Sequence, residues 1–154
     1  MVEAALNRTP VSIITGFLGS GKTTLINYLV SLDNLRDTAL IINEFGEIGL
    51  DHILVESSFE NTLLLENGCI CCSIRGDLVD TISDLFTNVT NGKIPAFSRI
   101  IIETTGLADP RPIVISIDEN PALRDRVRLD SVISTVDGIL GKNQMEKYQE
   151  ASIQ

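Results

Sequence analysis

The segment from Gly16 to Thr23 has the residue types and the spacing of a phosphate-binding loop. It reads Gly-Phe-Leu-Gly-Ser-Gly-Lys-Thr and matches G-x-x-x-x-G-K-[ST] at every position. Glycines let the backbone curl so that successive N–H groups point at phosphate oxygens, and a following helix adds the positive end of its dipole. We expect Lys22 to contact the β- and γ-phosphates and the hydroxyl of Thr23 to ligate Mg²⁺. The alternative is an ordinary glycine-rich turn with an exposed lysine.

A second phosphate-side element is expected at Arg99 to Gly106, which reads Arg-Ile-Ile-Ile-Glu-Thr-Thr-Gly. An apolar strand here presents the carboxylate of Glu103 and then a glycine toward a γ-phosphate. Walker-B segments usually end in aspartate, but glutamate is also a hard oxygen donor that can bind Mg²⁺ directly or through water. We expect Glu103 to bind Mg²⁺ or a water molecule and the Gly106 amide to sense the γ-phosphate. The alternative is a glutamate that only caps a strand at the surface.

All three cysteines fall within four residues, at Cys69, Cys71 and Cys72. An odd number of cysteines cannot all pair within one chain, so a disulfide framework is a poor explanation. Thiolates are soft ligands that favour Zn²⁺, Cu⁺ or Co²⁺ over Mg²⁺. A helix expected to begin near Ser73, together with Arg75, would lower the thiol pKa values. Redox-active thiols and cysteines buried as small apolar residues are the alternatives.

Three cysteines leave a tetrahedral metal site one ligand short. The fourth ligand could be a side chain of this chain, water or a residue of a second chain. An open or shared site is suited to metal transfer more than to a permanent structural role. The candidate side chains are Glu44, Glu47, Asp51 and the single histidine, His52.

Composition narrows the class of protein. A chain of 154 residues, 44% of them hydrophobic, is long enough for one domain with a core on both sides of a sheet. The formal net charge of -9 argues against a nucleic-acid partner, because no broad positive surface is available to neutralise phosphates. No apolar run approaches the roughly 20 residues that span a bilayer, and the first ten residues lack the apolar block of a signal peptide. We expect a cytoplasmic protein with reduced thiols and no membrane partner.

Apolar runs alternate with helical periodicity along the chain, which predicts an α/β fold with a mostly parallel sheet and helices on both faces. Ligands of such sheets bind at the carboxyl ends of the strands, so the loops after Thr15, Ile42 and Ile102 should converge on one rim. Buried strands are expected at Val11 to Thr15, Thr38 to Ile42, Arg99 to Ile102 and Ser131 to Val136.

Three helices are expected between these strands. The first follows the glycine-rich loop, and the third is capped by Asp109 with Pro110 in its first turn. The second ends near Asn91-Gly92 and should expose Asp77, Asp80 and Asp84. The apolar face is expected to be Leu25, Tyr28, Leu29 and Leu32 in the first helix, and Leu78, Ile82, Leu85, Phe86 and Val89 in the second.

Four segments together resemble the CobW family of metallochaperone GTPases: Thr15 to Thr24, Asn43 to Glu47, Gly68 to Cys72 and Glu103 to Pro110. Their order and spacing match from about Val11 onward, and the C-x-C-C separates this family from its urease- and hydrogenase-maturation relatives. The resemblance implies a P-loop NTPase fold of the SIMIBI GTPase class. In it, Asn43 to Asp51 resembles switch I, Glu103 to Gly106 resembles switch II, and the three cysteines resemble the metal-binding cysteines.

The resemblance also implies a preference for GTP with Mg²⁺, slow intrinsic turnover, and zinc, or else cobalt or another transition metal. Expected partners are a client metalloprotein or metal-insertion enzyme and a nucleotide- or metal-dependent second copy. Residues 1–10 are then an N-terminal extension and residues 11–154 the GTPase domain. The family's Asn-Lys-x-Asp-like motif and carboxy-terminal domain do not occur before Gln154, so we expect this domain to be incomplete at its C-terminal end.

The resulting hypothesis is a metal chaperone in which nucleotide orders the loop from Asn43 to Asp51, completes the metal site, and releases metal on hydrolysis. A P-loop kinase is a rival, although its acceptor pocket would have to use the distant arginines 124, 126 and 128. A non-catalytic, zinc-stabilised nucleotide-binding module is another.

The expected site residues fall into three groups. We expect catalytic roles for Lys22, Glu44 and Glu103. We expect nucleotide contacts from Gly16, Phe17, Leu18, Gly19, Ser20, Gly21, Lys22, Thr23, Thr24 and Gly106, and metal ligands at Thr23, Glu44, Cys69, Cys71, Cys72 and Glu103.

Overall fold

The structure of the chain is a computed structural model, which describes residues 8–32, 35, 37–42, 58–59, 62–64, 70–73 and 77–154. None of the helices in this part of the chain is long and apolar enough to cross a membrane. The strands are β1 (Thr9–Gly16), β2 (Thr38–Ile42), β3 (Ser58–Phe59), β4 (Thr62–Leu64), β5 (Ile70–Ser73), β6 (Arg99–Glu103) and β7 (Val127–Thr135). The helices are α2 (Lys22–Val30), α3 (Leu78–Thr90), α4 (Arg111–Glu119), α5 (Gly141–Lys147) and α6 (Gln149–Ile153).

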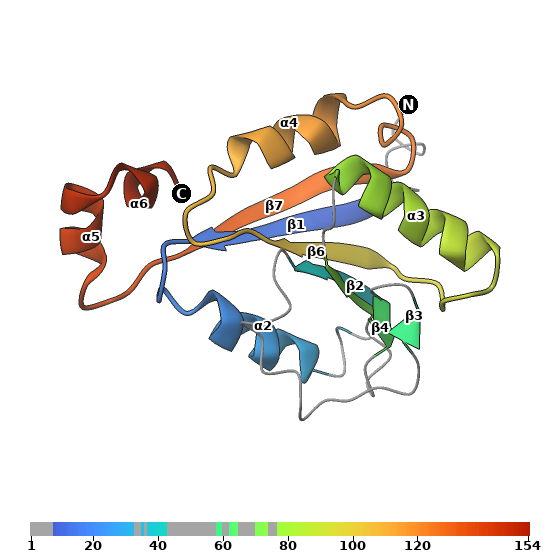
Figure 1. Cartoon of the computed structure of the whole chain (residues 1–154), viewed down its shortest axis with the longest axis horizontal. Coiled ribbons are helices and arrows are strands. Elements are labelled where there is room, and N and C mark those ends of the chain that lie inside the picture. Colours follow the sequence, from blue (N-terminus) through green and yellow to red (C-terminus); the bar gives the residue numbers. More distant parts are fainter. Residues whose placement is uncertain are drawn as a thin grey trace.

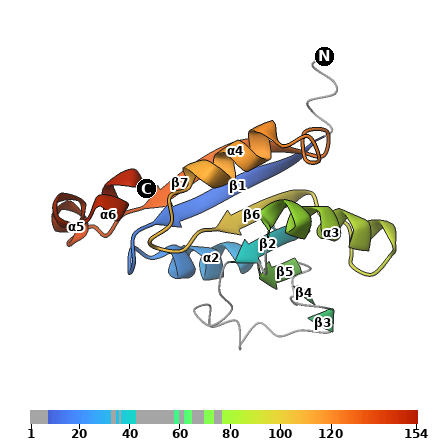
Figure 2. The ribbon, with the colours of Figure 1, turned by 45° about the horizontal axis from the view of Figure 1, so that its top comes forward.

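The strands form one sheet in the order β3-β4-β5-β2-β6-β1-β7. The run from β5 to β7 is parallel, while β3 and β4 are antiparallel additions at one side. Helices α3 and α4 lie over one face and α2 over the other, whereas α5 and α6 lie beyond the carboxyl end of β7 (Figures 1 and 2). The predicted α/β class with a mostly parallel sheet covered on both faces is therefore confirmed.

Alternation along the central strands explains why both faces are covered. Successive side chains of a strand point to opposite faces, and in β1 Ile13 belongs to the core under α3 and α4 while Ile14 belongs to the core under α2. In β6, Ile100 and Ile102 face the first core and Ile101 faces the second. A strand that is apolar at every position can be stable only between two layers of helices.

The predicted apolar face of the first helix is partly wrong. The structure buries Lys22, Ile26 and Val30 of α2, whereas Tyr28 is 62% exposed. Leu25 and Leu29 pack only against the margin of the core. The reason is the phase of the helix: the side chain of its first residue, Lys22, turns inward to the phosphate loop, so the positions four and eight residues later face the sheet.

The second helix has the predicted buried face and ends where predicted, with Asn91 as its C-cap residue. Ile82 and Leu85 are buried in α3, and Asp77 accepts a hydrogen bond from the backbone N–H of Val79 at 2.7 Å as the N-cap. α4 begins one residue later than predicted, because Pro110 and not Asp109 occupies its N-cap position. Asp109 nevertheless accepts a hydrogen bond from the backbone N–H of Arg111 at 2.9 Å.

The prediction of a buried strand at Ser131 to Val136 is wrong in its burial and its start. β7 begins at Val127 and pairs with β1 alone among the strands that the structure describes. Val132 and Ile133 are 45% and 42% exposed. An apolar run does not by itself distinguish a central strand from the outer one of a sheet.

Candidate functional site

The phosphate loop has the backbone conformation that its glycines predict. It joins the end of β1 to the start of α2, and Gly16, Gly19 and Gly21 have φ values of 138°, 74° and 97°. These positive values lie where residues with a side chain are strained and glycine is not. The N–H of Ser20 donates to the carbonyl of Phe17 at 3.1 Å and closes a turn inside the loop. The strand, loop and helix context required by the motif is thus present.

The side chain of Lys22 folds back over the phosphate loop, so that its ammonium lies beside the start of the loop. Its Nζ donates to the carbonyl oxygens of Gly16 at 2.8 Å and Phe17 at 3.3 Å, and the residue is only 8% exposed. The exposed lysine of the ordinary-turn alternative is therefore excluded. Thr23 follows it, half-buried, in the first turn of α2, and Thr24 is exposed.

Glu103 and Gly106 lie beside this loop. Glu103 is the last residue of β6, is 7% exposed, and pairs in register with Ile14 of β1 and Ile42 of β2. A glutamate that caps a strand at the surface is thereby excluded. A Cβ on Gly106 would lie 2.7 Å from the backbone nitrogen of Leu18, so the chain after β6 packs directly on the phosphate loop.

Buried hydroxyls fasten the end of β6 to β1 at this edge. Thr104 donates its backbone N–H to the carbonyl of Ile14 at 3.0 Å and its hydroxyl to that of Thr15 at 2.9 Å. Both threonines are almost completely buried. Because each buried hydroxyl has a partner, the connection costs little desolvation energy. It also fixes the position of the end of β6, which carries Glu103.

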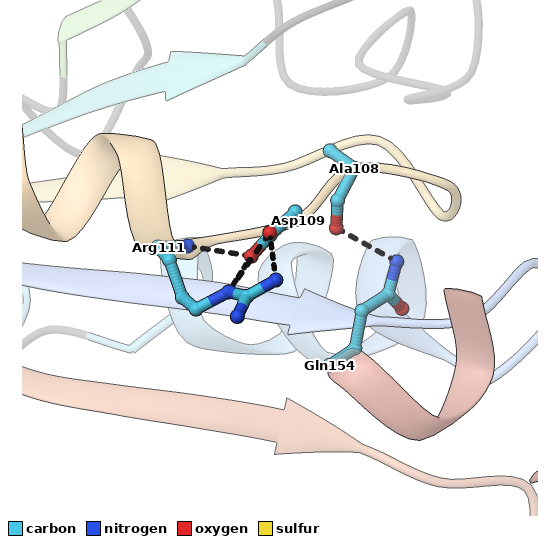
Figure 3. Close-up of polar contacts among 4 residues, drawn as sticks. All are labelled: Ala108, Asp109, Arg111 and Gln154. Atoms are coloured by element: carbon cyan, nitrogen blue, oxygen red, sulfur yellow. Dashed lines mark hydrogen bonds and ion pairs between the residues drawn. The ribbon is translucent and has the colours of Figure 1, made fainter. Parts of the chain in front are cut away.

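Sequence reasoning missed the part that α5 and α6 play around the loop. The ring of Phe17 stacks on that of Tyr148 with centroids 5.3 Å apart. The Nε2 of Gln154 donates to the carbonyls of Gly106 at 2.9 Å and Ala108 at 3.0 Å, the second of which is drawn in Figure 3. Each contact joins residues more than forty positions apart. No local pattern could have found them.

Two carboxylates at this end of the sheet have lowered pKa values. Hydrogen bonds from the Arg111 side chain and backbone lower the pKa of Asp109, and the same contact raises the pKa of Arg111 (Figure 3). Hydrogen bonds from the backbone N–H groups of Leu140 and Ile139, each 2.7 Å long, lower the pKa of Asp137. Both aspartates are partly exposed to solvent, so their carboxylates stabilise turns and are not buried acids.

Two of the three cysteines lie on a strand of the same sheet. β5 pairs with β2 through Cys71 and Leu40 and through Cys72 and Ile41. The helix expected to begin near Ser73 begins instead at Leu78, since Ser73 is the last residue of β5. Along the chain, α3 therefore starts farther from Cys71 and Cys72 than predicted. Outside the described residues lie Cys69, Glu44, Glu47, Asp51, His52 and Arg75, whose roles stay predictions.

The arginine cluster needed by the rival kinase hypothesis lies at the other end of the strands. Pairing of Thr9 with Val127 and of Gly16 with Thr135 sets Arg124 and Arg126 at the amino end of β1, away from the phosphate loop. Arg126 stacks over the ring of Phe86 at 5.7 Å, and Arg128 pairs with Asp130 at 2.8 Å. These arginines cannot form an acceptor pocket next to a γ-phosphate.

A protein-family model matches almost the whole chain: the model of the CobW/HypB/UreG nucleotide-binding domain matches residues 10–154. The chain is a member of this CobW-type family. It is 40% identical to "Zinc chaperone YjiA" of Escherichia coli over 97% of this chain and 46% of that protein. It is 34% identical to "Zinc-regulated GTPase metalloprotein activator 1" of Dictyostelium discoideum over 92% of this chain and 32% of that protein.

Solved structures agree with this assignment. The crystal structure of Zn(II)-bound YjiA GTPase from E. coli superposes with a TM-score of 0.77 at 39% identity, covering 94% of this chain and 45% of that one. A Zn(II)-bound triple mutant of the YjiA GTPase gives a TM-score of 0.82 at 37% identity, over 94% and 45% of the two chains. This CobW-type chain thus spans between about a third and a half of the length of the relatives that it matches.

Proposed function

We propose that this CobW-type chain binds and slowly hydrolyses GTP and couples the state of the nucleotide to the binding and release of a transition metal. Zinc is the first candidate, because relatives with 34–40% identity are named zinc chaperones or zinc-regulated GTPases. The proposed recipient is a client metalloprotein or metal-insertion enzyme, and a second copy of the chain is a further proposed partner. Reduced cysteines require a reducing compartment, for which we propose the cytoplasm.

The order of the strands is the observation that carries this proposal. β2 lies between β5, which contains Cys71 and Cys72, and β6, which ends at Glu103. The chain that leaves β2 after Ile42 therefore starts between the cysteine strand and the phosphate side of the sheet. With about 4.8 Å between neighbouring strands, β5 and β1 are about 14 Å apart. One loop could contact ligands on both sides, which is what coupling requires.

The residues around the loop fit a nucleotide with Mg²⁺. Thr23 on α2 and Glu103 at the end of β6 offer a hydroxyl and a buried carboxylate, both of which are hard oxygen donors. When bound, Mg²⁺ would neutralise charge that develops on the phosphates. Lys22 would supply the second positive charge, and the Gly106 amide would bind the γ-phosphate. Glu44, in the loop after β2, is our candidate for the residue that binds the metal or a water molecule.

Zinc affinity measured in three nucleotide states tests the proposal. The chain would be titrated with Zn²⁺ against a chromogenic chelator without nucleotide, with GDP and Mg²⁺, and with a non-hydrolysable GTP analogue and Mg²⁺. We expect zinc affinity with the GTP analogue to differ from that with GDP by at least about tenfold, a coupling free energy within the usual range.

Variants of the cysteines and of Lys22 test zinc binding and its dependence on nucleotide separately. Cys71→Ser and Cys72→Ser should weaken zinc binding in all three states, while Lys22→Ala should preserve zinc binding and abolish its dependence on nucleotide. Ser73→Ala, at the end of the same strand, is the control and should behave as wild type. If zinc affinity were equal in the three states, or if both cysteine variants bound zinc normally, the metal-coupling proposal would be wrong even where GTP was hydrolysed.

A further inference from the structure

Thr135, the last residue of β7, contacts the phosphate loop at two places although it lies 112 positions or more from the loop in sequence. Its hydroxyl lies 2.7 Å from that of Ser20, and a Cβ on Gly16 would lie 2.3 Å from the Thr135 hydroxyl and 2.4 Å from its carbonyl oxygen. The end of β7 therefore touches both the first and the fifth residue of the loop.

The direction of these hydrogen bonds follows from the number of protons. The Thr135 hydroxyl donates to the carbonyl of Thr15 at 3.2 Å. A hydroxyl has one proton, so the 2.7 Å contact must be a hydrogen bond donated by Ser20 to Thr135. The Ser20 side chain is thus directed outward to β7, and the turn closed by its backbone N–H on Phe17 is fixed from both ends.

We infer that Thr135 is a positioning residue that holds the phosphate loop in its binding conformation before nucleotide arrives. A loop with three glycines at positive φ has many accessible conformations, and ordering it on binding costs affinity. A hydroxyl that fixes Ser20 and a backbone that occupies the space beside Gly16 reduce that cost in advance. The inference rests on the proposed binding of nucleotide at this loop, and it assigns to β7 a role that the loop motif does not contain.

The same pair of strands offers an internal control. Four residues earlier on β7, the hydroxyl of Ser131 donates to that of Ser12 on β1 at 2.9 Å. This bond is likewise between two hydroxyls and involves β7, but it joins β7 to the middle of β1 and does not contact the loop. Removing it should change the free energy of unfolding by a similar amount without changing nucleotide affinity.

Binding of fluorescent GDP and of a fluorescent GTP analogue to the whole chain tests the inference. Thr135→Val, which keeps the shape and removes the hydroxyl, should weaken both nucleotides by the same factor of about ten, because loop backbone N–H groups hold the α- and β-phosphates that both share. Thr135→Ser should restore wild-type affinity. Ser20→Ala should resemble Thr135→Val, and the double variant should be no weaker than either single one, since all three lack the same hydrogen bond. Ser131→Ala should bind as wild type.

Three results would overturn the inference while leaving the proposed function intact. These are wild-type affinity in Thr135→Val, an equal loss in Thr135→Ser, which keeps the hydroxyl and would show that the hydroxyl does not set the affinity, and additive losses in the double variant. A wild-type chain that bound neither nucleotide would instead contradict the proposed function. Thermal unfolding of each variant in the absence of nucleotide shows whether it is folded, and only folded variants are compared.

Discussion

The ammonium of Lys22 lies 2.8 Å from the carbonyl oxygen of Gly16, so the last residues of the phosphate loop are tied to its first one. Two backbone carbonyls thus hold the lysine charge close to the phosphate loop. Phosphate oxygens are stronger acceptors for an ammonium than carbonyls are. The arrangement is therefore ready to exchange a carbonyl partner for a phosphate.

We predict that Lys22→Ala lowers the affinity for GTP by at least about a hundredfold, since it removes a charge-assisted contact in a buried position. Lys22→Arg should not restore binding, because a planar guanidinium cannot replace a compact ammonium inside the loop. Equilibrium binding of a fluorescent GTP analogue gives the affinities. Lys93→Ala, on the surface after α3, is the control, and GTP binding by Lys22→Ala at wild-type affinity would contradict a role for this lysine.

Gly106→Ala should disturb the phosphate loop, because the added methyl group would collide with the backbone of Leu18. The new Cβ would lie 2.7 Å from the backbone nitrogen of Leu18 and 2.9 Å from its Cα, so backbone must move. We expect a loss of about 1–3 kcal/mol in unfolding free energy and at least tenfold slower GTP hydrolysis, both consistent with overpacking at a binding site.

Gly138→Ala is the matched control for that substitution. Gly138 lies in a loop at the same end of the sheet, and a Cβ there would meet nothing within 4 Å. Its stability, by chemical denaturation, and its hydrolysis rate should equal those of wild type. Equal behaviour of the two alanine variants would show that the approach of Gly106 to Leu18 is unimportant for the loop.

Gln154→Ala should loosen the chain after β6. Its amide donates hydrogen bonds to the carbonyls of Gly106 and Ala108. We expect local opening of residues 104–108 to become easier by about 1–2 kcal/mol, the net value of two such bonds. Amide hydrogen exchange followed by mass spectrometry measures it. Gln149→Ala serves as the control, and unchanged exchange in Gln154→Ala would contradict the prediction.

The Asp137 carboxylate should stabilise the turn before α5 in a pH-dependent manner. Backbone hydrogen bonds lower its pKa below the ordinary value of 3.8, so the folded chain binds this proton less readily than the unfolded chain. The stabilisation is therefore complete above about pH 5 and disappears as the pH falls through the lowered pKa. Asp137→Ala should unfold at a lower temperature than wild type at neutral pH, and the difference should shrink toward about pH 3.

Asp137→Asn checks the cause of that pH dependence. The asparagine oxygen can still accept from Ile139 and Leu140 but carries no charge, so its melting temperature should lie between those of wild type and Asp137→Ala at neutral pH. Melting curves by circular dichroism provide the comparison. A difference between wild type and Asp137→Ala that stayed constant across this range would indicate that the carboxylate's charge contributes nothing.

The sequence alone determined the α/β class, the strand, loop and helix around Gly16 to Thr23, and the family. The loop depends on glycine torsions and on a lysine at a fixed spacing, and both are local properties of the chain. Strands such as Thr38–Ile42 were also predictable, because an uninterrupted β-branched and apolar run fits only a sheet buried on both faces. The same logic failed for β7, where hydropathy could not tell an outer strand from a central one.

Only the tertiary structure decided which distant groups surround the loop. Ser20 bonds to Thr135, Phe17 stacks on Tyr148 and Gly106 packs on Leu18. Each of these contacts joins residues from different elements, and their meeting depends on the strand order β5-β2-β6-β1-β7. Strand order is set by the packing of all layers at once, because local periodicity is compatible with many orders. For the same physical reason, the position of the cysteine strand relative to the phosphate loop could not be read from spacing along the chain.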